Sequence, residues 1–288
     1  MDTIRNPIEW GMDALKDAAH AVESTGVSLH GTEAEGDASR PVVRKIGFAD
    51  LREALAKGFG DFGAYRTDVV FLCIIYPAAS LVLIHLAFNH DMLALLFPMA
   101  SGFALVGPVA AVGLYEMSRR RERGLAASWV DAFAMVRQPS FGAIVTLGLV
   151  LLAFFLLWLG AAQLIYMSTL GPEPPAAVGA FLGEVLTTGP GWTMIVAGCG
   201  VGFLFAVVVL ATSVVSFPLL LDRPVGIGIA VATSFRAVLV NPGVMAGWGL
   251  IVAGGLVLGS IPLFLGLIVV MPVLGHATWH LYRKVVRE

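Results

Sequence analysis

The chain has 288 residues, of which 58% are hydrophobic and 13% are charged, and its mean hydropathy is +0.85. A soluble domain contains about 45–50% apolar and about 25% charged residues, so water cannot be the solvent for most of this surface. The net charge is −2 and the basic residues lie in short segments, which argues against a nucleic-acid partner. Cys73 and Cys199 both lie in apolar runs, which excludes a disulfide scaffold and a zinc cluster. The composition therefore predicts an all-α integral membrane protein.

Residues 1–42 are predicted to be a cytoplasmic appendage of the membrane domain at 43–288. Apolar residues from Ile4 to Val22 recur at helical spacing and predict an amphipathic helix, followed by the acidic, flexible linker STGVSLHGTEAEGDASRP. The opening MDTIRNPIEWGMDALKD has no apolar core, so we expect no cleaved signal peptide. Such a tethered helix suits docking on a partner or on the protein's own cytoplasmic face.

Three short amphipathic segments recur along the chain, at 48–59, 128–139 and 230–242. Each carries a basic residue and places apolar side chains at i, i+3 and i+4, a pattern typical of a helix lying in the membrane interface. Each ends near glycine or proline and precedes a pair of apolar runs. The sequence therefore predicts three repeats of an interfacial helix followed by a transmembrane hairpin.

The apolar runs predict six transmembrane helices, because a helix needs about 20 residues to cross the hydrocarbon core. The run from Gly243 to Tyr282 is too long for one crossing, and Ser260-Ile261-Pro262 supplies the break because proline interrupts the helical hydrogen bonds. The predicted spans are 69–88, 94–115, 142–168, 192–221, 243–259 and 261–282.

All lysines and arginines lie on one side of this topology. Segments 1–68, 116–141, 222–242 and 283–288 hold eight, five, two and three of the 18 basic residues, and the other connections hold none. Positive charge is retained on the cytoplasmic side during insertion. We therefore expect an inner-membrane protein with both termini in the cytoplasm.

The segment GLYEMSRRRERG at 113–124 concentrates four arginines, which mark the cytoplasmic end of the second span. Attraction to anionic lipid headgroups is one expectation for them, and a dedicated ligand site is the other. Trp129, at the start of the second interfacial segment, joins them as a candidate lipid or partner contact. The candidate arginines are Arg119, Arg120, Arg121 and Arg123.

His276 and His280 lie one helical turn apart, a spacing that can hold a metal ion. No carboxylate or cysteine lies near them in the sequence, so hydrogen bonds to backbone or headgroups are the expected role. We count both as candidate lipid or partner contacts and predict no metal and no cofactor. The spans contain no aspartate, glutamate, lysine or arginine at mid-depth, which argues against a proton-coupled carrier.

Prolines are spaced ten residues apart in two spans, at Pro98 and Pro108 and at Pro262 and Pro272. Discontinuous helices of this kind can form the substrate site of a transporter. The other interpretation is kinked helices that pack through small residues. The chain also lacks HExxH, a phosphate-binding P-loop, GxSxG and a GxGxxG in a strand–helix setting, so no enzymatic activity is predicted.

Four motifs resemble a family of uncharacterised predicted integral membrane proteins of proteobacteria: ADLREALAKGFGDF, FPMASGFALVGPVAAVGLYEMSRRRERG, VVSFPLLLDRPVG and VMPVLGHATWHLYR. The resemblance covers residues 44–284 and implies location and topology rather than activity. Some members carry a cytochrome oxidase subunit I label. This chain has only six histidines, two of them before residue 43, and cannot supply the haem and copper ligands that the label requires.

These observations favour an accessory or scaffolding subunit of a larger membrane assembly, a respiratory complex being one candidate. A permease or channel for a small neutral or amphiphilic solute is the alternative. A mid-membrane aqueous cavity would favour transport, whereas a filled bundle with an exposed docking face would favour the subunit.

Overall fold

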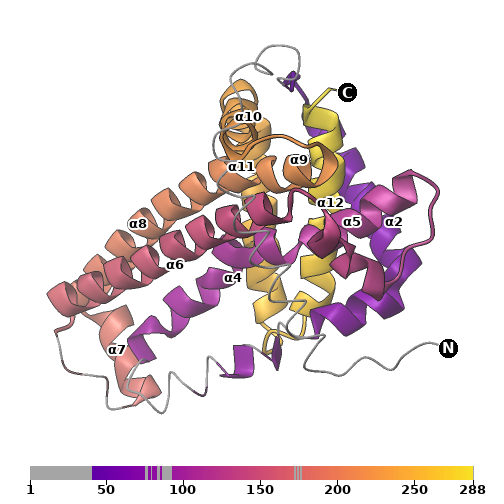
Figure 1. Cartoon of the computed structure of the whole chain (residues 1–288). Coiled ribbons are helices and arrows are strands. Elements are labelled where there is room, and N and C mark those ends of the chain that lie inside the picture. Colours follow the sequence, from indigo (N-terminus) through magenta and orange to yellow (C-terminus); the bar gives the residue numbers. More distant parts are fainter. Residues whose placement is uncertain are drawn as a thin grey trace, which may run out of the picture.

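The computed structural model describes residues 41–74, 77–78, 80–82, 85, 93–171, 173, 175 and 177–287, and their regular structure is helical (Figure 1). The predicted N-terminal helix within residues 1–42 lies outside them. The all-helical prediction is confirmed for the described residues. The elements are α2 (Phe48–Cys73), η2 (Leu93–Leu95), α4 (Leu96–Ala110), α5 (Val112–Glu122), η3 (Trp129–Arg137), α6 (Phe141–Thr169), α7 (Val178–Thr187), α8 (Gly189–Ser213), α9 (Ser216–Asp222), α10 (Ile227–Val240), α11 (Pro242–Ser260) and α12 (Leu267–Val285).

Three helical segments among the described residues are long and apolar enough to cross a bilayer: 141–169, 189–222 and 242–260. They match the predicted spans 142–168, 192–221 and 243–259. Shorter apolar helices lie at 93–102, 178–187 and 227–240. The prediction of six crossings in three repeats remains a prediction.

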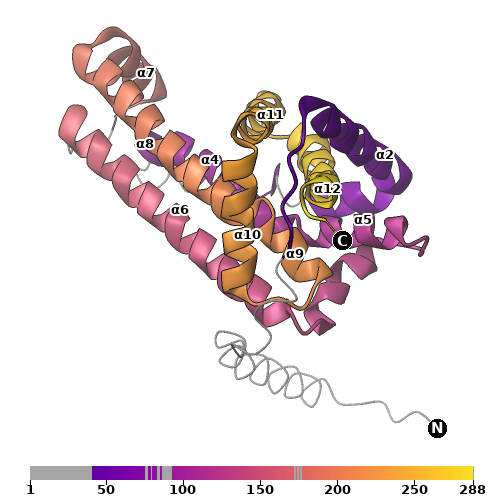
Figure 2. The same ribbon diagram turned by 90° about the horizontal axis from the view of Figure 1, so that it is seen from above.

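The paired helices α6 and α8 run side by side and, with α4 alongside and α7 at their far end, extend away from α2 and α12 (Figures 1 and 2). At about 1.5 Å per residue, the 29 residues of α6 span roughly 43 Å, whereas the 19 residues of α11 span roughly 28 Å. A hydrocarbon core of about 30 Å suits α11 upright but requires α6 to tilt. The strong inclination of α6 to α11 in Figure 1 agrees with this requirement.

The predicted span 94–115 is divided at Ala111 between α4 and α5. Pro108 lies one turn before the break and lacks the N–H that a continuous helix requires. The predicted span 192–221 is likewise divided, because Val214 and Val215 separate α8 from α9. These divisions place α9 against α5, which carries the arginine segment, so the side chains of the two helices can meet.

The predicted break after Ser260 is confirmed, and residues 261–266 form the tight connection between α11 and α12. Leu263 and Phe264 have φ of 52° and 64°, a region that L-residues rarely occupy. Gly259 and Gly266 allow the two arms of the connection to approach closely, since a Cβ on Gly266 would lie 2.7 Å from the Cα of Gly259. α12 therefore begins six residues later than the predicted span 261–282.

The predicted interfacial segments differ in form. The first does not end at Phe59 but continues to Cys73, with a kink at Tyr65. The second is the 3-10 helix η3, and the third is the separate α-helix α10. The connection between the predicted spans 142–168 and 192–221 also contains a helix, α7. It was not predicted, because its apolar run is only ten residues long.

The C-terminal half of α12 is the centre of the packed region and makes its most extensive contact with α2. Gly58 permits this approach, because a Cβ on it would lie 2.7 Å from both Cβ and N of Ala277. Leu51, Ala54 and Asp61 share the buried face of α2 with it. The first and last described long helices thus lie against one another.

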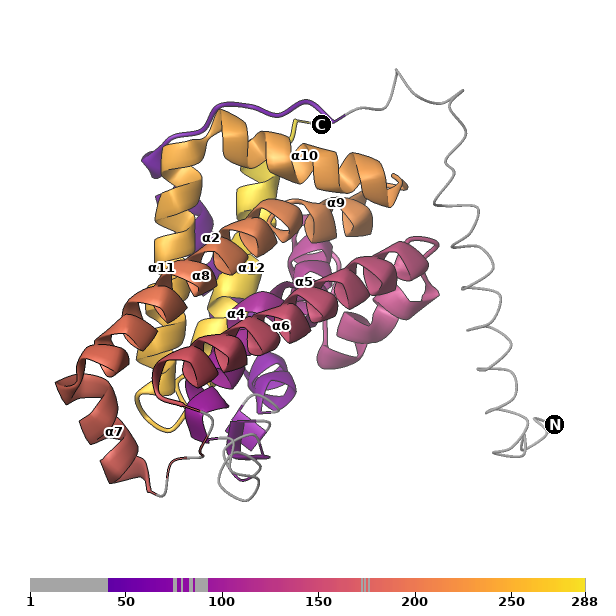
Figure 3. The same ribbon diagram turned by 90° about the vertical axis from the view of Figure 1, so that its left-hand side faces the viewer.

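Residues 41–47 cross the ends of α10 and α11 and pair with the C-terminal residues (Figure 3). Val43 and Val286 form an isolated antiparallel bridge, and the N–H of Arg44 donates to the carbonyl of Val285 at 2.8 Å. The buried amide of Asn241 accepts from the N–H of Ile46 at 2.8 Å and donates to the carbonyl of Arg44 at 2.9 Å. Asn241 therefore fixes the entry to α2 against the junction of α10 and α11.

Gly58→Ala tests the close approach of α2 to α12. The added methyl meets the Ala277 backbone, so we expect a loss of about 1–3 kcal/mol in unfolding free energy. Gly63→Ala is the matched control, because no atom lies within 4 Å of its added Cβ and alanine favours the helix. Thermal unfolding in detergent should show a lower midpoint for Gly58→Ala and an equal or higher midpoint for Gly63→Ala, each compared with the parent chain. Equal midpoints for the two variants would contradict the packing described.

Candidate functional site

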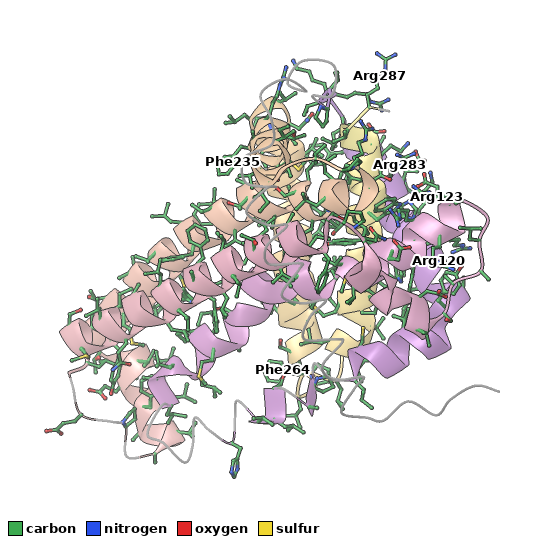
Figure 4. The ribbon with its side chains drawn as sticks, viewed as in Figure 1. Arg120, Arg123, Phe235, Phe264, Arg283 and Arg287 are labelled. Atoms are coloured by element: carbon green, nitrogen blue, oxygen red, sulfur yellow. The ribbon has the colours of Figure 1, made fainter. Side chains whose placement is uncertain are left out.

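The candidate residues gather where α2, α5, α9 and α12 meet. The labelled arginines Arg120, Arg123, Arg283 and Arg287 lie along one edge of the molecule, and Phe264 lies toward the opposite end (Figure 4). α5 carries three of the predicted arginines in its last turn and Arg123 directly after it, and α12 carries His276 and His280. The structure brings these two predicted groups together through carboxylates from other elements.

Asp61 of α2 joins α5 and α12. Its Oδ2 accepts from the Ser118 hydroxyl at 2.5 Å and lies 2.8 Å from Nε2 of His280. Its Oδ1 accepts from Nη1 of Arg121 at 2.7 Å, and the Arg121 guanidinium lies 5.9 Å from the centroid of the Tyr65 ring. Asp61 is only 4% exposed, so a carboxylate there depends on these donors.

Burial opposes ionisation of Asp61, but the hydrogen bonds from His280 and Ser118 outweigh burial and lower the pKa of its carboxyl group. The carboxylate is therefore the stable form at neutral pH. Removal of its charge would leave the Arg121 guanidinium without its anionic partner, although an oxygen would remain to accept the hydrogen bond.

Ser118 also contacts His276, whose Nδ1 lies 2.8 Å from the same hydroxyl oxygen. The hydroxyl has one proton, and an ionised Asp61 is the stronger acceptor. Ser118 then donates to Asp61 and accepts from Nδ1–H of His276, which selects that tautomer. Nε2 of His276 is buried and has no hydrogen-bond partner among the described residues. This cluster is a chain of fixed donors and acceptors rather than an open reaction site, because Ser118 and His276 are fully buried.

Each predicted arginine pairs with a carboxylate from the same chain. Arg119 Nη2 lies 2.7 Å from Oε2 of Glu116, and Arg120 Nη2 lies 3.1 Å from Oδ1 of Asp131. Arg121 pairs with Asp61, and Arg123 lies 3.5 Å from Asp222. The prediction that these arginines contact lipid or a partner remains a prediction, and the structure adds intramolecular roles that the sequence did not indicate.

Glu116 is buried beside Arg119, and burial raises the pKa of its carboxyl group more than Arg119 lowers it. Nε2 of Gln138 donates to Oε2 of Glu116 at 3.4 Å. Nη1 of Arg119 donates to the carbonyl of Leu221 at 2.5 Å. Arg119 therefore ties α5 to the end of α9.

A second set of contacts joins α12 to the ends of α5 and α9. The Tyr282 hydroxyl donates to Oδ2 of Asp222 at 2.8 Å, and the Trp279 indole donates to Oε2 of Glu122 at 3.2 Å. Arg283 lies between the two carboxylates, 3.3 Å from Glu122 and 3.5 Å from Asp222. The three charged residues come from three different helices, Glu122 from α5, Asp222 from α9 and Arg283 from α12. Their contacts therefore hold these helices together at this end.

Trp129 begins η3, and its side chain lies outside the described side chains. The element is held by a capping box in which Ser128 and Asp131 bond reciprocally, with N–H of Ser128 donating to Oδ2 of Asp131 at 2.9 Å. Arg120 pairs with the same Asp131. η3 is therefore fastened to α5 by Arg120, for which the sequence suggested a lipid, partner or ligand contact.

Sequence reasoning missed Asp61 as a site residue. It lies 219 residues before His280, so their proximity has no local signal. Its burial was nevertheless visible, because Leu51, Ala54, Gly58, Asp61 and Tyr65 follow the helical spacing of a packed face. The predicted stripe stopped at Phe59, since that helix was expected to be short.

Within the described ranges, no three histidine, cysteine, aspartate or glutamate residues are grouped to hold a metal ion. The predicted absence of a metal or cofactor is not tested by this finding. The ion pairs described above can hold α2, α5, α9 and α12 in fixed positions, and the arginines among them can present guanidinium groups to an anion.

Residues 96–222 match the family described as predicted integral membrane protein (DUF2189). This match confirms the resemblance to an uncharacterised membrane family over α4 to α9. It includes Ser118, the arginine segment and Asp222, whereas Asp61, His276 and His280 lie outside it. No curated protein and no solved structure matches the chain.

Asp61→Asn tests the buried carboxylate. The variant keeps the side-chain shape but weakens the bonds from Arg121, His280 and Ser118, so we expect a loss of about 1.5–3 kcal/mol at neutral pH. Because folding lowers the pKa of Asp61, its contribution is complete above the unfolded pKa of about 3.9 and disappears as pH falls through the folded pKa. Unfolding followed from neutral to acidic pH should therefore show the two proteins converging. Glu53→Gln, an exposed carboxylate of the same helix, is the control and should change little; a matching loss in both variants would contradict a special role for Asp61.

Proposed function

We propose that this integral membrane protein is an accessory or scaffolding subunit of a larger assembly in the bacterial inner membrane. In this proposal it performs no chemistry of its own, and it docks through an apolar face of α8 against a transmembrane helix of a partner. A respiratory complex remains one candidate assembly.

The observation that carries the proposal is the contrast between the two parts of the molecule. The most apolar 18-residue window within 189–222 is only 11% buried, the lowest value of the three membrane-length segments. By comparison, α9 is buried up to Leu221, and no residue in the C-terminal half of α12 is exposed. The charged contacts among α2, α5 and α12 thus stabilise a packed region, and α6 and α8 extend from it.

The outward face of α8 combines large and small side chains. Val196, Phe203 and Leu204 are 62–69% exposed, and Gly200 lies between them on the same face. A Cβ on Gly200 would meet no atom within 4 Å. Small residues on a membrane helix allow another helix to approach closely, which makes this face suitable for helix docking.

A permease or channel for a small neutral or amphiphilic solute is the alternative. The packing of the central region supports the subunit instead, because Phe217, Trp248, Trp279 and Tyr282 are each less than 2% exposed. Two hollows of the described surface lie near arginines, one at the ends of α5, α9 and α12 and one beside Arg236 of α10. Neither supplies a mid-membrane cavity of the kind that transport requires.

The orientation proposed here places the arginine end in the cytoplasm and α7 outside. The end near α7 carries Tyr166 and Trp192, residues typical of a membrane–water interface, and its connection at 170–188 has no lysine or arginine. Both termini are then cytoplasmic.

Reporter fusions test this orientation. A fusion within Val178–Thr187 should report a periplasmic location, and fusions after Arg123 and Arg223 should report a cytoplasmic one, because positive segments are retained inside. Paired enzymatic reporters active on opposite sides provide the measurement and its internal control. A cytoplasmic result for α7 would overturn the proposed topology.

Gly200→Leu tests the docking face. The new side chain meets open space in the isolated chain, so thermal stability should hold while a close helix contact is blocked. We expect the variant to lose a membrane complex of defined composition that the parent chain forms. Native mass spectrometry and a photocrosslinker placed at position 203 measure this loss. Gly254→Leu on α11 is the matched control, since its Cβ also meets no atom within 4 Å.

Two outcomes would contradict the proposal. One is a complex that survives Gly200→Leu unchanged. The other is a chain extracted alone whose liposomes pass a neutral solute, which would favour the permease.

A further inference from the structure

A hollow of about 430 Å³ opens where α5, α9 and α12 end. Seven residues line it, and we refer to it as the arginine hollow: Arg119, Glu122, Arg123, Asp222, Arg223, Trp279 and Arg283. Its size is within the range of about 300–1,000 Å³ typical of small-ligand sites. The proposal that follows does not depend on a partner subunit.

The lining has an excess of positive charge. Four guanidinium groups face two carboxylates, those of Glu122 and Asp222. Glu116 lies behind Arg119 and pairs with it, so four guanidinium groups meet three carboxylates among the described residues at this place. Guanidinium groups keep their charge at every physiological pH, so the excess is permanent.

The two carboxylates inside the hollow do not engage their arginines as closely as other pairs of this protein do. Arg123 and Arg283 lie 3.5 Å from Asp222, and Arg283 lies 3.3 Å from Glu122. The pairs Arg121–Asp61 and Arg119–Glu116 are both 2.7 Å. A charge-assisted hydrogen bond is normally about 2.7–2.9 Å long, so the exposed guanidinium of Arg123 retains donor capacity for a further anion.

Two further donors support the same conclusion. Nε of Arg119 is buried and has no hydrogen-bond partner among the described residues. Arg223 donates through Nη2 to the carbonyl of Arg287 at 2.8 Å, a neutral acceptor, and no carboxylate of the described residues forms an ion pair with it. Trp279 forms a rigid wall, because its indole is fixed by Glu122.

We propose that the arginine hollow binds a phosphate group. Arginines from α5, α9 and α12 surround one space, and their planar donor forks suit the tetrahedral oxygens of phosphate. A carboxylate ligand would use fewer of these donors. The group can be carried by an anionic lipid headgroup or by a soluble phosphate ester, since both present the same chemistry.

The test uses the full chain purified in a neutral detergent. Its unfolding midpoint is followed against inorganic phosphate, against a short-chain phosphatidylglycerol and against a short-chain phosphatidylcholine, at constant ionic strength set with chloride. A ligand that binds only the folded chain raises the midpoint with concentration. We expect a saturable rise with inorganic phosphate or phosphatidylglycerol and a smaller one with phosphatidylcholine.

The comparison of ligands identifies the source. A rise with phosphatidylglycerol alone assigns a lipid headgroup, and a rise with inorganic phosphate at lower concentration assigns a soluble phosphate. No saturable rise with either would overturn the proposal.

Arg123→Gln with Arg223→Gln should weaken the apparent affinity at least about tenfold, since two charge-assisted contacts are removed. Arg52→Gln, an exposed arginine of α2 outside the hollow, is the matched control and should bind like the parent chain. Arg123→Gln alone serves if the double variant does not fold, because this side chain is 54% exposed and only loosely paired. Equal affinity in the parent and in the folded hollow variants would overturn the assignment.

Discussion

The carboxylate of Asp61 is the contact on which the arrangement of the packed region depends. It receives bonds from a serine and an arginine of α5 and from a histidine of α12, while its own helix lies against α12 through Gly58. A buried charge is costly unless it is paired, so each partner limits where the others can lie. The helices that carry these groups fix the positions of the predicted arginines and of the hollow beside them.

Local sequence patterns predicted the features that depend on composition and spacing. The spans at 142–168 and 243–259 agree with α6 and α11 to within a residue at each end, because long apolar runs leave little choice in lipid. The break after Ser260 was visible in its proline. The proline spacing predicted an interruption in the span at 94–115, but the exact position of the break at Ala111 was not predicted, because hydropathy does not locate a bend. The helix α7 was not predicted either, because its apolar run is short.

The candidate site was predictable only in part. The arginine segment and the histidine pair were identified from their spacing, but their partners were not, since Asp61 and Asp222 lie far away in sequence. An arginine near the end of a span indicates the cytoplasmic side of the membrane, whether or not it also forms an ion pair within the protein. No carboxylate lies near His276 and His280 in the sequence. In the structure, however, Asp61 contacts His280 although it lies 219 residues away along the chain.

The pairing of α2 with α12 has a consequence for biosynthesis. Asp61 is made early, and the helix that carries His276 and His280 is made last among the described helices. At about 5–20 residues per second, the ribosome needs roughly 10–45 s to cover the 219 residues between Asp61 and His280. Before α12 is made, the carboxylate can bond to water or to Ser118 and Arg121, which follow it by 57 and 60 residues. The contact between α2 and α12 can therefore form only after α12 has been synthesised, so the packed region is completed long after α2 has left the ribosome.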